Sequence, residues 1–407
     1  MLVLKFIESM VQWSVIMKGI ADVKGFLCGT GRGGIKKTEK PVDRDDVLVI
    51  VSETSATVAA VFTKNDIKAA PVKLSMEVVS SQDRVFGIVA NSGNANACTG
   101  EQGFKDAEKM VKMCENLTGK KHFLVASTGV IGEPFVDRVE KGIEGAVKTL
   151  GAKSSSEAAA AIMTTDTFPK VAFFDGGGFS IGGIAKGAGM IDPAMATMLS
   201  FITTDVDIEK GLLQKILREV TDETFNAITV DGDMSTNDTV FILANGMSGI
   251  KIDESNCEIF VTGLKEVMGS LAYQIVKDGE GATKVARIIV EGALTKEEAR
   301  KIARKIALSP LVKTAVFGCD PNWGRIIAAA GSACVGIDEG KLRLKIGDFL
   351  LFDGKRADYC EDDIYNYMKT SDEIVINLHI GRGNKSFEYL TCDLTCDYVR
   401  INAEYRT

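Results

Sequence analysis

Segments patterned as strands alternate with segments patterned as helices along both halves of this 407-residue chain. Short apolar runs predict strands, and apolar residues at a spacing of three and four predict helices. The predicted strands are two within 47–62, on either side of 52–56, and others at 85–90, 123–126, 286–290, 342–346 and 373–380. The predicted helices are 101–117, 208–220, 259–276 and 296–308, the last after the capping box Thr295–Glu298. This interleaving favours a layered α/β fold over an all-α or all-β fold.

Charge and hydropathy exclude several classes of partner. The chain has 48 Lys and Arg against 55 Asp and Glu, a net charge of −7, and no block of five like charges. This argues against a nucleic-acid or acidic-membrane surface. The sequence contains no uninterrupted run of about 18 apolar residues, which a helix needs to cross a bilayer. Residues 1–17 lack the parts of a secretory signal, so we expect an extra N-terminal helix, or a start assigned too early with Met10 or Met17 as the true one. We expect a cytoplasmic protein.

Cysteine and histidine limit the chemistry further. The nine cysteines are scattered, and no two form a C-x-x-C pair, so we expect reduced thiols that mostly fill the core and no zinc site. Only two histidines occur, His122 and His379, and both are interpreted as structural. A base that works near neutral pH therefore has to come from another group.

Two glycine-rich segments resemble phosphate-binding loops only in part. Residues 29–34 contain G-x-G-x-x-G, but a loop follows where a dinucleotide site needs a helix, so a turn or a backbone crossing is favoured. The hypothesis that the protein is a nicotinamide-dependent oxidoreductase depends on this match alone, and we disfavour it. Residues 175–183 predict a hairpin.

The segment 186–205 carries the strongest chemical signal. A glycine-rich turn that contains Lys186 runs through Pro193 to Ala196 and Thr197, and an apolar strand follows from Met198. A threonine in this setting suits a nucleophile that is freed by cleavage of its own chain, through an N-to-O acyl shift. The new α-amine has an ordinary pKa of about 7.7–8.0, so it can deprotonate the neighbouring hydroxyl. A threonine at the start of a strand is also ordinary, so the pattern alone leaves both interpretations open.

Here the sequence resembles the ornithine acetyltransferase family of arginine biosynthesis. Lys186–Met190 and Pro193–Met198 are similar to the self-cleavage signature of that family. Further blocks similar to the family extend the resemblance from about Gly19 to Thr407, and they lie at 61–71, 91–97, 127–132, 162–170, 229–238, 320–325 and 398–407. Glu404, where the family more often has Asp, and the N-terminal extension depart from the pattern, and neither touches the proposed centre.

The resemblance implies a layered αββα-type sandwich, as in N-terminal nucleophile hydrolases, with a smaller C-terminal α/β domain. It implies an extension at 1–18, an α fragment at 19–196 and a β fragment at 197–407, whose C-terminal region starts at about 285. Cleavage between Ala196 and Thr197 would leave 196 residues before the cut and 407 − 196 = 211 after it. Thr197 corresponds to the nucleophile, and Thr128 and Gly129 correspond to the oxyanion hole. The implied substrate-binding residues are Thr164, Lys186, Thr197, Glu280, Asn402 and Thr407, with Thr165 and Thr167 as alternatives to Thr164.

The implied reaction moves an acetyl group from N-acetylornithine to glutamate through an acetyl-Thr197 intermediate. Lys186 would pair with the substrate carboxylate and Glu280 with the δ-ammonium. We expect no metal and no resident cofactor. The sequence leaves open whether acetyl-CoA also donates the acetyl group. Family members of this kind form α2β2 assemblies, which we carry over as an expectation.

Two alternative functions remain at this level. An amidase or β-aminopeptidase of the same nucleophile superfamily would let water resolve the acyl-enzyme. A non-enzymatic amino-acid-binding protein would keep the pocket without the chemistry, against which the presence of Thr197, Thr128 and Gly129 argues.

Overall fold

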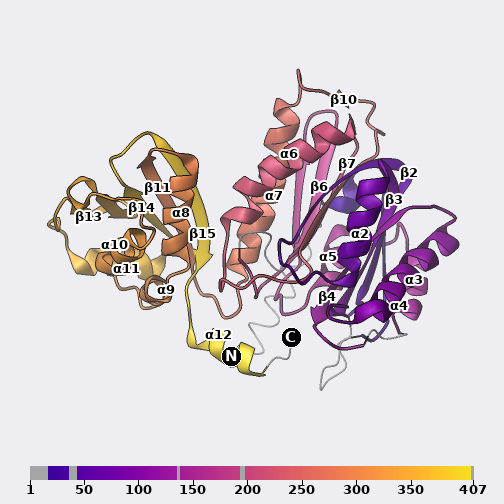
Figure 1. Ribbon diagram of the computed structural model, residues 1–407, viewed down its shortest axis with the longest axis horizontal. Coiled ribbons are helices and arrows are strands. Elements are labelled where there is room, and N and C mark those ends of the chain that lie inside the picture. Colours follow the sequence, from indigo (N-terminus) through magenta and orange to yellow (C-terminus); the bar gives the residue numbers. More distant parts are fainter. Residues whose placement is uncertain (1–16, 36–43, 135–137, 193–197, 405–407) are drawn as a thin grey trace.

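The chain folds into a large lobe and a smaller lobe, placed side by side along the longest axis of the molecule (Figure 1). The computed structural model describes residues 17–35, 44–134, 138–192 and 198–404. The predictions made for residues 1–16 and for Ala196, Thr197 and Thr407 lie outside the described residues.

The large lobe is built on an eight-stranded sheet with the order β4-β3-β2-β9-β7-β6-β5, and β1 pairs with β2 beside this path. Its strands are β1 (Phe26–Gly31), β2 (Val47–Phe62), β3 (Arg84–Asn94), β4 (Phe123–Val130), β5 (Lys170–Asp175), β6 (Ser180–Lys186), β7 (Leu199–Thr204) and β9 (Thr239–Ala244). A short parallel pair, β8 (Asp207–Ile208) and β10 (Lys251–Ile252), lies apart from the sheet.

The prediction of two strands within 47–62 is wrong, because β2 is continuous. Its first half pairs with β1 and β3, and its second half pairs with β9. The pairing with β3 shifts register between Val51 and Ala56. This irregularity leaves Glu53 and Thr54 exposed without ending the strand, so the polar residues that suggested a turn lie on a bulge.

The two halves of the sheet face each other across a shared apolar core. Leu48 and Ile50 of β2 belong to the same buried cluster as Phe201 of β7 and Phe241 of β9. Helices α6 (Lys210–Glu223) and α7 (Glu258–Lys277) pack on the outer face of β6, β7 and β9. Helices α3 (Gly100–Thr118) and α4 (Arg138–Lys148) cover the outer face of the other half. The predicted αββα layering is therefore confirmed (Figure 1).

Two further helices complete this lobe. Helix α5 (Ser155–Ile162) contributes Ala158 and Ile162 to the central core, and a capping box of Ser154 and Glu157 starts it. Helix α2 (Ala70–Ser81) is fastened to β4, since the Ser75 hydroxyl donates to the Val125 carbonyl at 2.7 Å.

The glycine-rich segment at 29–34 is a backbone crossing, as one of the two favoured interpretations held. Gly29 and Gly31 lie in β1 directly beneath α4. A Cβ at either position would stand 2.0 Å from a carbonyl oxygen of that helix, on Ala146 and Gly142 respectively. Glycine is needed here so that the strand and the helix can approach closely. The predicted hairpin is also confirmed, as antiparallel β5 and β6.

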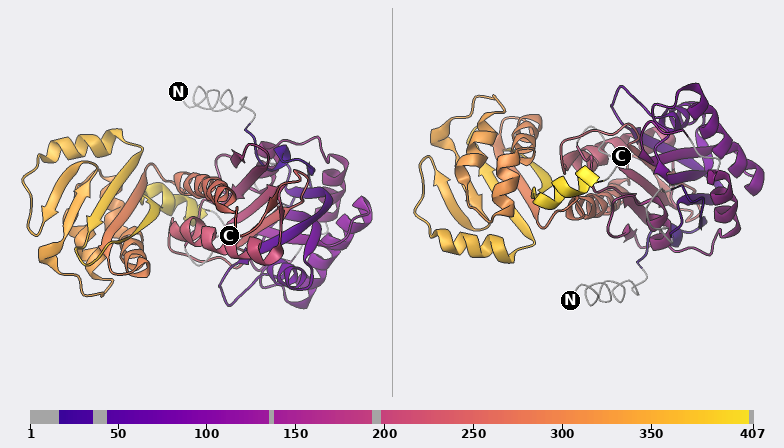
Figure 2. Two further views of the ribbon diagram at one scale, coloured as in Figure 1. Left: turned by 90° about the horizontal axis from the view of Figure 1, so that it is seen from above. Right: turned by 90° about the horizontal axis from the view of Figure 1, so that it is seen from below.

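The small lobe is a five-stranded sheet with the order β13-β12-β14-β11-β15. Its strands are β11 (Val285–Ala293), β12 (Arg343–Ile346), β13 (Phe349–Asp353), β14 (Glu373–His379) and β15 (Lys385–Cys392), and its helices are α8 (Lys296–Ala307), α9 (Pro310–Phe317), α10 (Trp323–Gly331) and α11 (Glu361–Thr370). Strands β12 and β14 alternate between buried and less buried residues, so one face of the sheet carries the core. The final helix α12 (Cys396–Glu404) runs back from this lobe toward the large one (Figure 2).

The four predicted helices correspond to α3, α6, α7 and α8, with ends that differ by at most three residues. The prediction that cysteines mostly fill the core is wrong, since only Cys28, Cys114, Cys319 and Cys392 are buried among nine free thiols. No helix within the described ranges combines the length and apolar character needed to cross a membrane.

Candidate active site

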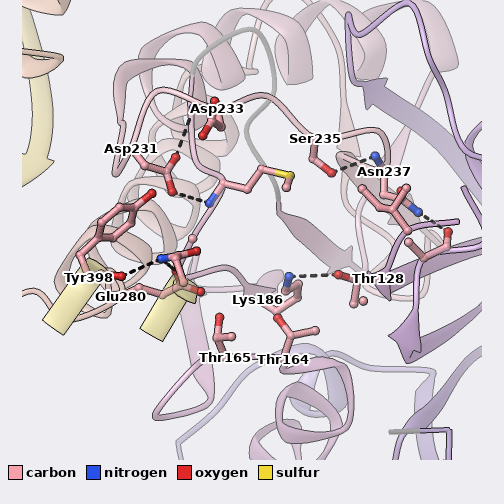
Figure 3. Close-up of a pocket in the computed structure, with 16 residues that line it drawn as sticks. Thr128, Thr164, Thr165, Lys186, Asp231, Asp233, Ser235, Asn237, Glu280 and Tyr398 are labelled. Carbon is pink, nitrogen blue, oxygen red and sulfur yellow. Dashed lines mark hydrogen bonds between the residues drawn. The ribbon is translucent and has the colours of Figure 1, made fainter. Parts of the chain in front are cut away.

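A pocket opens in the large lobe where β4 and β6 end, and α12 closes one side of it (Figure 3). In this view Glu280 lies at the left, Lys186 in the middle and Thr128 at the right. The pocket is lined by Ala95, Thr128, Gly129, Ile131, Thr164, Thr165, Lys186, Gly189, Met190, Asp231, Asp233, Ser235, Asn237, Glu280, Tyr398 and Asn402.

Thr128 and Gly129 lie at the end of β4, which runs parallel to β3. Gly129 has a φ of +130°, and a Cβ there would stand 2.3 Å from the carbonyl carbon of Gly93. Both observations require glycine at this position. The side-chain amide of Asn237 donates to the carbonyls of Ala95 and Ser127, at 2.6 and 2.9 Å. These contacts fix the main chain next to Thr128.

Lys186 ends β6, and its side chain is buried in the pocket wall. Its ammonium donates to the Thr128 hydroxyl oxygen at 3.0 Å. Because that oxygen accepts from lysine, the hydroxyl hydrogen of Thr128 can be donated elsewhere. Burial lowers the pKa of Lys186, and the negative charge of Asp166 is the main opposing influence. The Lys186 ammonium and the Thr128 hydroxyl are thus linked by a hydrogen bond in the pocket wall.

Glu280 and Asn402 form the opposite end of the pocket. The Asn402 amide of α12 donates to a Glu280 carboxylate oxygen at 2.8 Å, and the Glu280 amide donates to the Ala188 carbonyl at 2.9 Å. Gly281 has a φ of +70°, and a Cβ there would lie 2.6 Å from the Tyr398 nitrogen. Glycine at 281 therefore lets α12 approach the Glu280 loop.

Asp231 holds the turn that leads toward the predicted cleavage position. Its carboxylate accepts the main-chain amides of Met190 and Ile191, at 2.6 and 2.8 Å. Met190 has a φ of +58°, which is uncommon for a side-chain-bearing residue. Burial raises the pKa of Asp231 to about 6, although these amides and that of Asp233 act in the opposite direction.

Asp238 anchors the first described residue on the other side of that position. Its Oδ1 accepts the Met198 amide at 3.1 Å, and the Thr239 amide donates to the Met198 carbonyl at 3.1 Å. The other carboxylate oxygen is buried, and no residue within the described part of the chain pairs with it. Burial raises the pKa of Asp238 well above its usual range, against the effects of the Met198 amide and Lys186. Both flanks of 193–197 are therefore held by aspartates, the half-buried Asp231 on one side and the buried Asp238 on the other.

The pocket brings together most of the residues that the sequence singled out. Thr128, Gly129, Lys186, Glu280 and Asn402 all line it. Thr164 and Thr165 also line it, and the choice between them stays open. Thr167 does not: it is exposed, and both its amide and its hydroxyl donate to Asp278.

Sequence reasoning missed several polar residues of the pocket. Asp231, Asp233, Ser235 and Asn237 come from one loop that precedes β9, and Tyr398 comes from α12. The signal was available, because the segment 229–238 is a run of small and polar residues directly before an apolar strand.

The two histidines lie away from the pocket. His122 and His379 are both exposed, and neither lines the pocket. In the described ranges no three His, Cys, Asp or Glu side chains come together as a metal site would require.

Comparison with known proteins shows the family of this chain. The model of the ArgJ family matches residues 28–407. The chain belongs to the ArgJ family. The arginine biosynthesis bifunctional protein ArgJ of Geobacter sulfurreducens is 44% identical over 401 residues, which cover 95% of this chain and 100% of that protein. The glutamate N-acetyltransferase of Methanopyrus kandleri is 45% identical, with 94% of this chain and 99% of that protein covered.

A solved structure of the family is also similar. The crystal structure of the arginine biosynthesis bifunctional protein ArgJ from Bacillus halodurans shares 41% sequence identity with this chain at a TM-score of 0.50. The similarity covers 51% of this chain and 100% of that one. The resemblance found in the sequence is confirmed, and the protein is an acyltransferase of the ArgJ family.

Proposed function

We propose that this enzyme transfers the acetyl group of N-acetylornithine to glutamate through an acetyl ester on Thr197. The order of groups along the pocket supports this assignment (Figure 3). N-acetylornithine carries, in sequence, an acetyl group, an α-carboxylate and a δ-ammonium. Thr128, Lys186 and Glu280 follow each other in the same order. An oxyanion donor, a cation and a carboxylate would then each meet the matching group.

The first half-reaction forms the acetyl-enzyme. The Thr197 hydroxyl attacks the acetyl carbonyl carbon, and the α-amine of Thr197 takes its proton. Thr128 and Gly129 stabilise the oxyanion, an effect typically worth about 3 kcal/mol per donor. The amide C–N bond then breaks, the leaving nitrogen takes the proton, and ornithine departs.

The second half-reaction returns the free enzyme. The glutamate amine attacks the ester carbonyl, the C–O bond to Thr197 breaks, and the hydroxyl regains a proton from that amine. Both substrates carry an α-carboxylate, so Lys186 can hold each in turn. This alternation in one pocket predicts ping-pong kinetics.

Chain cleavage between Ala196 and Thr197 is a prerequisite of this mechanism, since it frees the α-amine. Denaturing mass spectrometry of the purified protein should show two fragments that meet at this bond. Thr197→Ala should abolish cleavage and transfer, whereas Thr197→Ser should retain part of both. An intact chain with full transfer activity would contradict self-cleavage.

Substrate assays decide between the transferase and the amidase or β-aminopeptidase alternative. We incubate the enzyme with acetyl-labelled N-acetylornithine, with and without glutamate. A transferase gives labelled N-acetylglutamate and, without glutamate, a β fragment heavier by one acetyl group. Release of free acetate at the same rate in both samples would favour the hydrolase.

Two finer points belong to the same proposal. Replacing N-acetylornithine with acetyl-CoA as the donor tests whether the enzyme is bifunctional, as the Geobacter sulfurreducens relative is named. Native mass spectrometry tests the proposed α2β2 assembly, which would appear as two copies of each fragment.

A further inference from the structure

A buried ionic cluster lies behind the pocket wall, and the mechanism above does not use it. The Lys170 ammonium contacts an Asp166 carboxylate oxygen at 2.7 Å and an Asp278 carboxylate oxygen at 2.6 Å. The side chains of Lys170 and Asp166 are 0% exposed, and that of Asp278 is 3% exposed. Burying three charges is costly unless each is paired and hydrogen-bonded. A cluster retained at such a cost calls for a purpose beyond packing.

Asp166 reaches two separate walls of the pocket through main-chain hydrogen bonds. One carboxylate oxygen accepts the Thr164 amide at 2.9 Å. The other accepts the Gly187 amide at 2.7 Å, in addition to the lysine ammonium. Thr164 lines the pocket, and Gly187 directly follows Lys186. A single carboxylate therefore ties the threonine loop to the end of β6.

Asp278 connects the same cluster to the third wall. It accepts the Thr167 amide at 3.0 Å and the Thr167 hydroxyl as well. Asp278 stands two residues before Glu280, whose own amide is bonded to Ala188. Lys170 thus joins the loops that carry Thr164 and Glu280.

The charge of Asp166 also acts on Lys186. The charged groups that most influence the buried Lys186 ammonium are Asp166, Lys170, Asp238 and Glu280. Asp166 is the strongest of the three carboxylates that favour the charged lysine, while burial and Lys170 disfavour it. Burial alone would raise the pKa of Asp166, but Lys170, Lys186 and the Gly187 amide outweigh it, so the pKa lies below its usual range. The pKa of Asp278 is instead raised by burial.

We propose that Asp166 is a positioning residue of the acetyl-transfer site, which fixes Thr164 and Gly187 and keeps Lys186 charged for the substrate carboxylate. Lys170 holds Asp166 in place and is itself paired with Asp278. This inference rests on the proposed function, in which Lys186 binds the α-carboxylate of the substrate.

The test compares Asp166→Asn with the wild type in acetyl transfer between pH 6 and 10. We expect kcat/KM for N-acetylornithine to fall by about 10- to 100-fold. We also expect the alkaline limb of its pH profile to move down by about one unit, because Lys186 loses its main counter-charge. The substrate δ-ammonium titrates in the same limb, but the substitution leaves it unchanged.

Two other variants separate positioning from general stability. Asp278→Asn also removes a carboxylate from Lys170, but its charge acts on Lys186 less than those of Asp166, Asp238 and Glu280 do. Its alkaline limb should therefore move less than that of Asp166→Asn. Asp205→Asn is the matched control, since Asp205 is equally buried and accepts the Ser180 amide at 2.8 Å outside the pocket. It should keep the wild-type kcat/KM and pH profile.

The outcomes keep the two proposals apart. Wild-type kcat/KM and an unshifted limb in Asp166→Asn would overturn the role of Asp166 while the transferase assignment stands. A wild-type enzyme that transfers no acetyl group would overturn both. If Asp166→Asn does not fold, Asp166→Glu takes its place: it keeps the charge, so kcat/KM should fall with no shift of the limb, and wild-type kcat/KM would refute the positioning.

Discussion

The two lobes differ in how many charged residues they bury. The large lobe buries charged residues, among them Asp166, Lys170, Lys186 and Asp238. The core of the small lobe is a cluster of apolar residues, and its described part buries two charged residues, Lys313 and Asp393 directly after β15. Buried charge costs stability unless it is compensated. The comparison teaches that the large lobe, which holds the pocket, buries more charged residues than the small lobe does.

The lobes meet beside the candidate site. Arg304 of α8 pairs with the buried Asp192 at 2.5 Å, and the Thr229 amide donates to the Leu390 carbonyl of β15 at 2.9 Å. Asp192 directly precedes the segment 193–197, which contains the predicted cleavage position. The small lobe therefore supports the site from outside, through a few polar contacts and the returning helix α12.

The largest effect should come from the small-lobe core and should leave the chemistry intact. Ile376 of β14 is 1% exposed within that core. Ile376→Ala should lower the free energy of unfolding by about 3 kcal/mol, from lost burial and a residual cavity. Denaturant titration measures the loss, and kcat/KM at 25 °C should match the wild type. A large fall in kcat/KM in the folded variant would contradict the idea that the small-lobe core contributes stability and not chemistry.

A pair of buried lysines provides the next comparison. Lys186→Met removes the cation assigned to the substrate carboxylate and should lower kcat/KM by about 100-fold, since charge-assisted hydrogen bonds contribute about 1.5–3 kcal/mol. Lys313 is buried to a similar degree, and its ammonium donates to the Thr391 hydroxyl and the Cys392 carbonyl. Lys313→Met should cost stability and leave kcat/KM unchanged. Equal losses of kcat/KM in both variants would show that the effect of a lysine on activity depends on its burial and not on its position in the pocket.

Several elements could be predicted from one local pattern each. The helical spacing in α7 and α8 and the capping box at Thr295 located those helices, and the Gly129 and Lys186 blocks identified the pocket through resemblance. Strand β2 was predicted as two strands, because the polar residues at its centre resemble a turn. They lie on a bulge in the pairing with β3, which a local pattern does not reveal. The buried ionic cluster could not be predicted, since Lys170 joins Asp166 to Asp278, which lies 108 residues after Lys170 in the sequence.

The pH dependence of stability tests the acidic side of the pocket. The raised pKa of Asp231, about 6, means that the folded protein binds a proton more tightly than the unfolded chain does. Stability from this group is present below about pH 4 and is lost as the pH rises to about 6, by about 2 kcal/mol. Asp231→Asn should remove this slope. We would measure urea unfolding of both proteins from pH 4 to 7, and parallel curves would contradict the raised pKa.

The smallest effect should come from α12, through which the end of the chain reaches the pocket. Asn402 bonds to Glu280 and to the Tyr398 carbonyl and is exposed. Asn402→Ala should raise KM for N-acetylornithine by about threefold with kcat unchanged, because Glu280 keeps its charge and loses one orienting donor. Asn366→Ala in α11 is a control on an exposed helix of the small lobe. An Asn402→Ala effect as large as that of Lys186→Met would mean that α12 belongs to the chemical centre. The functional boundary between the lobes would then lie at Cys396, where α12 begins.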